Sequence, residues 1–351
     1  MKLITLDFET YYSPEYGLKK LTTEEYIRDP RFEPLLMGYK LDDDKRQYSV
    51  VGKGNIQTLC DALDIENSMV LCHHAHFDGL ILSHHFGHKP KIWLDTLSMA
   101  RAIHGTEVGG SLKKLLEYYN VGITKGTEVV NALGKRLADF SDSDLQNYRR
   151  YCMDDVEGTY RIFLEMMKVF PQHELKHIDM LIRMFTEPLV ELDEEMLREY
   201  AMTIQAEKMT MLIEAGVQLD EVMSNDKFAD ALRRLGVEPP MKVSPATGKL
   251  AYAFAKTDRE FLELLEDEDV RVQTLVSARL GNKTTIEETR ALRLASMATR
   301  GPACAYYKYA GAEQTMRVSG GDKTNFQNLK RGGTIRESIY APEDQCLTST
   351  T

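Results

Sequence analysis

The chain has 351 residues, a formal net charge of −10, and 43% hydrophobic and 28% charged residues. This composition is ordinary for a globular protein, and the length suits two or three domains of roughly 100–200 residues each. No apolar run approaches the roughly 20 residues of a membrane-spanning helix, and the first residues lack the pattern of a secretory signal. Five widely spaced cysteines without a CxxC pair argue against a disulfide framework and predict reduced thiols in the cytoplasm.

The charge is distributed unevenly along the chain. The segment Arg271–Arg336 holds twelve basic and four acidic residues, whereas the rest holds 32 basic and 50 acidic residues. This asymmetry suits an acidic, metal-binding part joined to a part that contacts a polyanion. A solvated basic helix face is the alternative explanation.

Hydrophobic periodicity predicts a mixed α/β region at the start of the chain. The predicted strands are Lys2–Phe8, Leu35–Leu41, Gln47–Val51, Met69–Cys72 and Lys91–Leu94. The predicted helices are Asn55–Leu63, Leu97–Ile103, Leu112–Tyr119 and a long one from Ser141, where Asp144 completes a capping box, to Phe170.

From Pro171 onward the pattern becomes mostly helical. Pro239, Pro240, Pro245 and Gly248 predict a loop over Glu238–Lys249. Regular periodicity fades from Gly301. The predicted helices of this part are His173–Thr186, Asp193–Ala215, Asp226–Leu235, Arg259–Leu265, Val270–Leu280 and Thr285–Met297.

Two carboxylates interrupt the first predicted strand, in the sequence DFET. Asp7 and Glu9 are two residues apart and therefore project to the same face of a strand. Two like charges this close repel each other, and a hard cation such as Mg²⁺ would relieve the repulsion. A strand end whose acids reach solvent is the simpler explanation for this pair alone.

Further acidic positions strengthen the metal hypothesis. Asp78 follows an apolar strand and lies at the start of an apolar helix. Tyr151 and Asp155 are four residues apart on the long helix and hence on one face. Each motif is weak alone, but their combination in this order is a strong signal.

DFET, HxxxFD and YxxxD in this order resemble the three motifs of the DEDDy 3′→5′ exonucleases, which have a ribonuclease-H-like fold. The resemblance implies that Asp7, Glu9, Asp78 and Asp155 bind two Mg²⁺ ions, or Mn²⁺ in their place. It also implies that Tyr151 orients the attacking water. Two metals roughly 3.5–4 Å apart suit in-line phosphodiester cleavage.

One position departs from the family pattern. His74 stands where the family usually has Asn, four residues before Asp78, and with Phe77 it is expected to contact substrate. Asp95 is predicted to be a capping or supporting residue, and Asp154 to face solvent. The clustered histidines from His73 to His88, with Cys72, leave a zinc site as a rival hypothesis.

A second resemblance covers Arg271 to Pro342. The sequences RVQTLVSARLGNKTTIEETR and VSGGDKTNFQNLKRGGTIRESIYAP are similar to the thumb and early palm of A-family DNA polymerases, particularly phage-type ones. The resemblance implies contacts to the phosphates or minor groove of a primer–template duplex. The residues concerned are Arg279, Lys283, Arg290, Arg317, Lys323, Asn325, Gln327, Asn328 and Arg331.

The resemblance ends where the family continues into its first catalytic aspartate, because this chain ends in APEDQCLTSTT. Palm aspartates and the fingers helix are missing, so polymerisation is not expected from this chain alone. The expected organisation is a ribonuclease-H-like α/β exonuclease domain over 1–172, a mostly helical linker and thumb-like region over 173–300, and an incomplete palm over 301–351.

The expected function is therefore metal-dependent 3′→5′ hydrolysis of DNA, as the proofreading part of an A-family polymerase in DNA replication. The expected partners are a single-stranded 3′ end and a primer–template duplex, with no membrane, in a bacterial cytoplasm or a phage-infected cell. An alternative is a DNA-clamping subunit that a separate palm-and-fingers chain completes. An exoribonuclease is disfavoured by the polymerase-like segment.

Overall fold

The computed structural model describes residues 1–123, 131–312 and 314–342. Its contacts divide the chain into two compact units. Unit 1 comprises Met1–Glu191, Arg300–Leu329 and the described residues after Tyr340, and unit 2 comprises Leu192–Thr299 and Lys330–Tyr340. These two units are defined by contacts within the chain. The three functional domains predicted from the sequence, with boundaries at residues 172 and 300, remain a prediction. The last residues of the sequence, including Cys346, lie outside the described residues.

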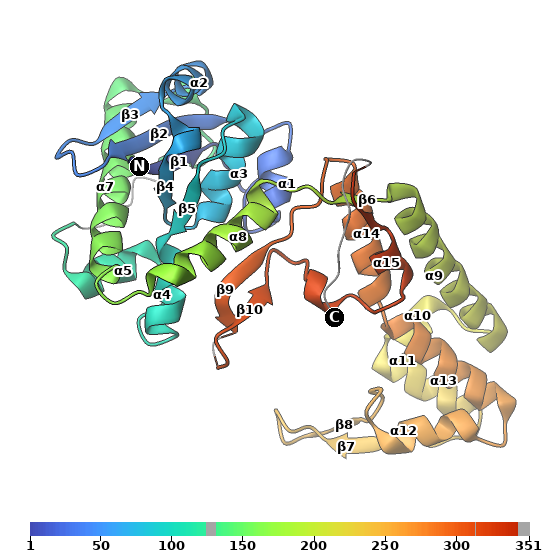
Figure 1. The fold of residues 1–351 in the computed structure, drawn as a ribbon. Helices are drawn as coiled ribbons and strands as arrows, with labels where there is room; N and C mark the ends of the chain where they lie inside the picture. The colour runs from blue at the N-terminus through green and yellow to red at the C-terminus, as the bar shows by residue number, and fades with distance from the viewer. Residues whose placement is uncertain (124–130, 313, 343–351) are drawn as a thin grey trace. The chain divides into compact units, whose positions relative to one another are not determined.

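Unit 1 is built on a five-stranded mixed sheet with the strand order β3-β2-β1-β4-β5 (Figure 1). Strand β1 pairs in parallel with β4 and antiparallel with β2, so the sheet is mixed as predicted. The observed strands agree with the predicted ones to within two residues at each end. They are β1 (Leu3–Thr10), β2 (Pro34–Leu41), β3 (Tyr48–Val51), β4 (Met69–Cys72) and β5 (Ile92–Asp95).

Helices cover both faces of this sheet. Neighbouring residues of a strand point to opposite faces of the sheet. On one face, Phe8 of β1 stacks on Phe86 of α3 (Ala75–Phe86) with ring centres 5.7 Å apart. On the other face, Asp7 contacts Cys152 of α7 (Asp142–Met166). Helix α8 (Leu175–Thr186) packs on α3 and β5. The other α-helices among the described residues of unit 1 are α1 (Thr23–Arg28), α2 (Lys53–Ala62), α4 (Thr96–His104) and α5 (Leu112–Tyr119).

Helix α7 lies unusually close to the sheet because Gly38 has no side chain. Gly38 of β2 pairs with Asp7, and a Cβ atom at Gly38 would lie 2.8 Å from the Cys152 Sγ and 3.2 Å from the Cys152 carbonyl oxygen. Real Cβ atoms do not approach other atoms so closely, so any larger residue would push α7 outward. The helix begins where predicted, at the N-cap Ser141, whose side chain accepts a hydrogen bond from the Asp144 N–H.

A late segment of the chain folds back into unit 1. Cys304 and Tyr306 lie in the same hydrophobic core as β1 and α3. They precede the hairpin formed by β9 (Tyr307–Ala312) and β10 (Arg317–Gly320). The Arg300 guanidinium donates to both carboxylate oxygens of buried Glu24 at 2.8 and 2.7 Å. The core of unit 1 therefore contains residues from two distant stretches of sequence.

Unit 2 has a separate core. Phe228, Phe254 and Phe261 pack edge to face or tilted at 4.9–5.9 Å. The predicted helices are confirmed, but part of the predicted loop forms a short hairpin of β7 (Met241–Val243) and β8 (Leu250–Tyr252). The helices are α9 (Glu194–Ala215), α10 (Leu219–Met223), α11 (Asn225–Arg234), α12 (Arg259–Glu263), α13 (Val270–Lys283), α14 (Ile286–Ala298) and α15 (Thr334–Glu337). The two-residue strands β6 (Glu191–Leu192) and β11 (Ile339–Tyr340) complete the assignment, with the 3-10 helices Ile65–Asn67, Leu137–Asp139, Gln172–Glu174, Leu264–Glu266 and Phe326–Asn328.

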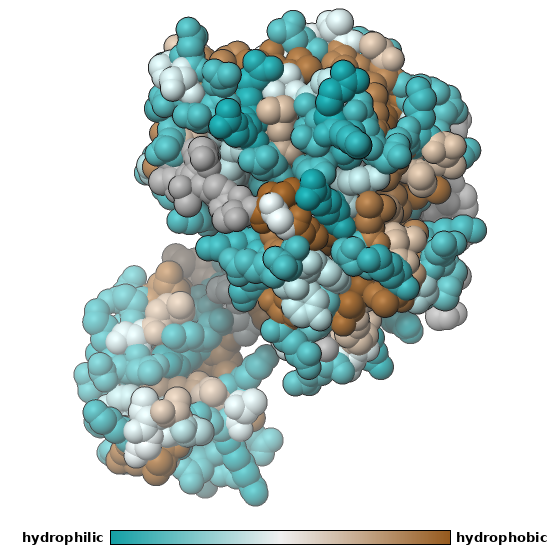
Figure 2. All heavy atoms as spheres, turned by 90° about the vertical axis from the view of Figure 1, so that its left-hand side faces the viewer, coloured by the Kyte–Doolittle hydropathy of each residue, from teal (hydrophilic) through white to brown (hydrophobic). Residues whose placement is uncertain are grey.

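The surface is mainly polar. Hydrophilic residues cover most of the face drawn in Figure 2, and hydrophobic residues form small patches between them. Within the described part of the chain, no helix combines the length and apolarity needed to cross a bilayer. Cys60, Cys72, Cys152 and Cys304 are free and buried, as the prediction of reduced thiols requires.

Replacing Gly38 tests the close approach of α7. We expect Gly38→Ala to destabilise unit 1 by about 1–3 kcal/mol, the usual cost of overpacking a core. The chain has one tryptophan, Trp93 on β5, so tryptophan fluorescence during urea unfolding reports on unit 1. Gly54→Ala is the matched control, because nothing lies within 4 Å of its Cβ position and alanine is favoured in a helix by up to about 1 kcal/mol. Equal stability of the Gly38→Ala and Gly54→Ala variants would contradict the packing argument.

Candidate active site

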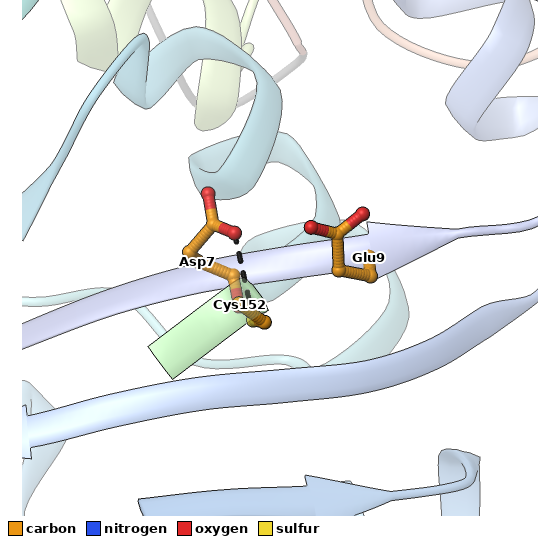
Figure 3. A group of neighbouring side chains, drawn as sticks. All are labelled: Asp7, Glu9 and Cys152. Atoms are coloured by element: carbon orange, nitrogen blue, oxygen red, sulfur yellow. Dashed lines mark hydrogen bonds between the residues drawn. The ribbon is translucent and has the colours of Figure 1, made fainter. Parts of the chain in front are cut away.

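Asp7 and Glu9 lie on the face of β1 that α7 covers. Because Thr5 pairs with Leu71 in β4, both acids lie beyond the carboxyl end of β4. Their carboxyl groups project from β1 to the same side, next to Cys152 (Figure 3). One carboxylate oxygen from each acid and the Cys152 Sγ all lie within 4.8 Å of one another. The predicted pairing of these two carboxylates on one face is therefore present in the structure.

The third predicted carboxylate comes from the first turn of α3. The Phe8 N–H donates to Asp78 Oδ1 at 3.0 Å, which fixes this side chain against β1. Asp78 is only 2% exposed, and burial, followed by the nearby Asp7 charge, raises its pKa well above the ordinary value. An ionised Asp78 is therefore disfavoured until a positive charge compensates it.

Tyr151 and Asp155 reach the same place from α7. Both side chains are buried, and Tyr151 is hydrogen-bonded to Asp155 with the charges of Glu9 and Asp7 close by. Burial and these acids raise the pKa of the Tyr151 hydroxyl above its usual range. At neutral pH this hydroxyl is consequently protonated and can donate a hydrogen bond. Asp154 is exposed, as predicted.

Sequence analysis missed two residues of the cluster, Tyr148 and Cys152. The Tyr148 hydroxyl donates to Glu9 Oε2 at 2.5 Å, and the Cys152 Sγ lies 3.5 Å from Asp7 Oδ2. With Tyr151 and Asp155 they occupy positions i, i+3, i+4 and i+7, which form one face of a helix. That spacing is the signal by which the sequence could have revealed them.

The donor set suits a hard divalent cation. Carboxylate oxygens are the ligands that Mg²⁺ and Mn²⁺ prefer, and Asp7, Glu9, Asp78 and Asp155 offer them from three separate elements. Burial raises the pKa of the Cys152 thiol well above its usual value, so this sulfur is not the thiolate that soft metals require. Burial and the Asp7 charge disfavour the ionised form of Asp78, and a bound cation would compensate its negative charge.

His74 and Asp95 shape the entry to α3. His74 is the N-cap of α3 with φ of +80°, and its N–H donates to Asp95 Oδ1 at 2.7 Å. Asp95 caps α4 by accepting from the Leu97 and Ser98 N–H groups, so its predicted capping and supporting role is confirmed. Among residues other than glycine, Asn, Asp and His are the ones enriched in this left-handed conformation, so His74 is compatible with its backbone.

Phe77 borders a small pocket beside the acidic cluster. Its ring lies 6.0 Å from that of Tyr26, and both line a cavity of about 240 Å³ together with Glu9 and Tyr148. The predicted substrate contact of Phe77 stays a prediction, and its position next to a carboxylate of the cluster is compatible with it.

The clustered histidines do not form a metal site among the described residues. They face different partners: His88 contacts Glu66 and Asp61, His85 bonds the Ile27 carbonyl, and buried His76 stacks on Tyr306 at 4.2 Å. Within the described ranges, the one group of potential ligands that converges contains no histidine.

The predicted DNA-contacting residues lie in both units. In unit 2, Lys283 is exposed, whereas Arg279 is 2% exposed. The Arg279 guanidinium donates to the Val222 carbonyl at 2.6 Å and lies 4.4 Å from the Phe228 ring, so it is part of the core packing of unit 2. Arg317, Gln327, Asn328 and Arg331 are exposed. Arg290 ion-pairs with Glu287, Asn325 caps a 3-10 helix, and Lys323 donates to the Lys20 carbonyl.

Comparison with known protein families finds a match for the region around the cluster. Residues 38–171 match the 3′-5′ exonuclease family of A-type DNA polymerases. The match contains Asp78, Tyr151 and Asp155, whereas Asp7 and Glu9 precede it and join the cluster through β1.

One solved structure has a similar fold over almost the whole chain. The POL domain of Pol1 from M. smegmatis, in complex with DNA primer-template and dNTP, is similar over 97% of this chain with 14% identity and a TM-score of 0.58. The chain spans 55% of that structure, and a likeness at this identity establishes the fold alone. NrnC from Brucella melitensis covers 51% of this chain and 81% of its own at 14% identity, with a TM-score of only 0.39. No curated protein matches the sequence.

The buried carboxylate of Asp78 predicts a measurable cost to stability. Because its pKa is raised in the folded protein, the cost is absent below the unfolded-state pKa of about 3.9 and grows as the pH rises above it. We expect Asp78→Asn to raise the melting temperature of metal-free protein at pH 7, with a gain that shrinks as the pH is lowered toward 4. The same variant should lose the stabilisation that millimolar Mg²⁺ or Mn²⁺ gives the parent.

Differential scanning fluorimetry across this pH range, with EDTA or with metal, measures both effects. Exposed Asp154→Asn is the matched control, for which we expect neither effect. A lower melting temperature of metal-free Asp78→Asn at pH 7 would refute the electrostatic argument.

Proposed function

We propose that this chain hydrolyses DNA from the 3′ end, as the proofreading exonuclease of an A-family DNA polymerase. The grouping of Asp7 and Glu9 carries the proposal, together with the contact of Asp78 with the Phe8 N–H and the position of Asp155 on the face of α7 that meets them. These residues come from β1, α3 and α7, and their burial with few compensating charges suits a pair of bound cations. The match of residues 38–171 to a 3′-5′ exonuclease family supports the same reaction.

The four carboxylates would hold two Mg²⁺ ions, or Mn²⁺, which supply an activated water and stabilise charge at the scissile phosphate. The protein's own residues fix the geometry. Tyr148 holds Glu9 through a short hydrogen bond, so this carboxylate has one orientation. Tyr151 keeps its proton and, hydrogen-bonded to Asp155, would donate to or position the attacking water. Neither tyrosine is suited to act as a general base, because the pKa of each is raised.

Single-stranded DNA is the substrate that the surroundings favour. The cavity beside Glu9 is lined by aromatic rings from Phe8, Tyr12, Tyr26 and Phe77, on which an unpaired base could stack. We place the protein in the cytoplasm of a bacterium or a phage-infected cell, since its described cysteines are free thiols.

The decisive experiment compares 5′-labelled single-stranded DNA and RNA of one sequence with Mg²⁺. We expect stepwise shortening from the 3′ end, faster on DNA, and a loss of at least about 10³-fold in Asp7→Ala, because several kcal/mol of transition-state stabilisation depend on the metals. Asp154→Ala, which changes an exposed acid of the same region, should retain full activity. Undiminished cleavage by Asp7→Ala would exclude this site as the catalytic centre.

As a second candidate function, this chain would bind a primer–template duplex, and a separate palm-and-fingers chain would carry out polymerisation. The excess of basic residues in Arg271–Arg336 and the polymerase-like fold support it. The chain alone should then bind a primer–template without extending it, and Asp7→Ala should bind equally well. Fluorescence anisotropy measures this binding. Affinity for duplex no greater than for an anionic control polymer, such as heparin, would refute duplex recognition.

A further inference from the structure

The cavity beside Glu9 has a wall that a distant part of unit 1, the late segment Arg300–Leu329, holds in place. We propose that Asp322 and Lys323 of this segment are positioning residues of the nuclease site, because they fix the stretch 17–26. The residues of this stretch that line the cavity are Gly17, Leu18 and Tyr26. The inference rests on the proposed exonuclease function and deepens it, since a 3′-terminal base in the cavity would lie against this wall.

Asp322 holds the first turn of α1. Its Oδ1 atom accepts a hydrogen bond from the Thr23 N–H at 2.7 Å, and its Oδ2 atom accepts one from the Glu24 N–H at 3.3 Å. Both donors belong to buried residues, so water is poorly placed to replace the carboxylate. A helix of six residues is too short to be stable by itself. The position of α1, and of Tyr26 on it, therefore depends on contacts of this kind.

Lys323 holds the turn that precedes α1. Its Nζ atom donates to the Lys20 carbonyl at 2.8 Å. The Lys20 and Leu21 N–H groups both donate to the Gly17 carbonyl at 3.0 Å, so the contact secures a compact turn that includes Leu18. The Leu18 side chain is 48% exposed, and a base that enters the cavity can contact it.

Two further contacts from the late segment support α1. The Arg28 guanidinium donates to the Pro302 carbonyl at 2.9 Å, and the Arg300 guanidinium pairs with buried Glu24 at 2.7 Å. Arg28 is the last residue of the helix. Together with Asp322, these contacts reach α1 from its first turn to its end, and all of them come from one stretch of the chain.

The turn that carries Asp322 and Lys323 has a defined conformation. The two residues have φ values of +52° and +60°, a left-handed backbone that is uncommon in residues other than glycine. Such strain persists where the surrounding structure fixes it. A Cβ atom at Gly321 would lie 2.6 Å from Tyr306 Cδ1, and Tyr306 belongs to the core of unit 1. The turn is therefore anchored to the core, and its two side chains extend that anchorage to the wall.

Lys323 has two candidate roles that lead to different expectations. The resemblance of GDKTNFQNL to a polymerase segment implies a contact with DNA phosphate, whereas the structure shows a contact with the Lys20 carbonyl. A phosphate contact would contribute to the binding of every strand. The wall would contribute only when the terminal nucleotide carries a base that can stack.

The experiment uses the full chain, Mg²⁺ and two 5′-labelled single-stranded oligonucleotides of one sequence. The 3′-terminal nucleotide of the second oligonucleotide lacks its base, and release of the first nucleotide is measured. For the parent we expect a KM about tenfold lower on the complete oligonucleotide, because a stacked base contributes that much affinity. In Lys323→Ala this KM should rise about threefold, while the KM on the abasic oligonucleotide and both kcat values stay unchanged.

Lys330→Ala is the matched control, because Lys330 is an exposed lysine of the same basic stretch, and we expect it to change neither KM. An equal rise of KM on both oligonucleotides in Lys323→Ala would show that Lys323 contacts the strand directly and would overturn its positioning role. Equal KM values of the parent on the two oligonucleotides would overturn it as well, since the wall would then hold no base. If the parent cleaves neither oligonucleotide, the proposed exonuclease function itself fails, and the positioning role fails with it.

Asp322→Asn tests the contact with α1. The amide keeps one acceptor oxygen, so one of the two N–H groups of α1 loses its partner. We expect the KM on the complete oligonucleotide to rise about threefold, again without a change on the abasic one. A rise on both oligonucleotides, or on neither, would exclude α1 as the element through which Asp322 acts. Lys323 is exposed, so Lys323→Ala keeps the fold and decides the proposal even if Asp322→Asn does not fold.

Discussion

The missing side chain at Gly38 sets the geometry on which the cluster depends. It lets α7 approach β1 and β2 until the Cys152 thiol touches the strand residues opposite it. Tyr148, Tyr151 and Asp155 are then held at the same depth by the helix itself, because they share its inner face. A helix displaced by the thickness of a methyl group would draw all three away from Asp7 and Glu9 together. Protein interiors are too closely packed to absorb such a change locally.

The same closeness makes the metal-free cluster electrostatically unfavourable. Several acids are brought together from different elements, and burial raises the pKa of Asp78. Natural proteins tolerate such costs at functional sites and offset them with stability elsewhere. Here Trp93, Leu71 and Ile81 are completely buried in the hydrophobic core of unit 1, which supplies such stability.

The sequence predicted the sheet, most helices and the acidic motifs, because each has a local signal. Apolar runs fixed β1 and β4 to within about two residues, and the spacing of Tyr151 and Asp155 was sufficient to place them on one face. The short helix α1 was missed although Thr22 and Glu25 form a capping box, since six residues give too little periodicity. The β7–β8 hairpin was missed because prolines and exposed three-residue strands resemble an ordinary loop.

The contribution of the β9 region could not have been predicted. His74 and Tyr306 are separated by 232 residues, and no local pattern reports contacts at such separations. The buried position of Arg279 could not be predicted from the sequence either, because a basic residue in a helix is usually exposed. Only the three-dimensional structure reveals that its guanidinium lies against Phe228 and Phe254.

The return of Arg300–Leu329 to unit 1 has a consequence for the biosynthesis of the protein. Leu192–Thr299 forms unit 2 and is synthesised between the two stretches of unit 1. Domains fold largely in the order in which the ribosome delivers them. The core of unit 1 therefore lacks Cys304 and Tyr306 until all of Leu192–Thr299 has emerged from the ribosome. Closing so long an intervening loop adds only modestly to the entropy cost, which grows with the logarithm of its length. Completion of the unit 1 core thus becomes a late event in translation, after the whole of Leu192–Thr299 has been synthesised.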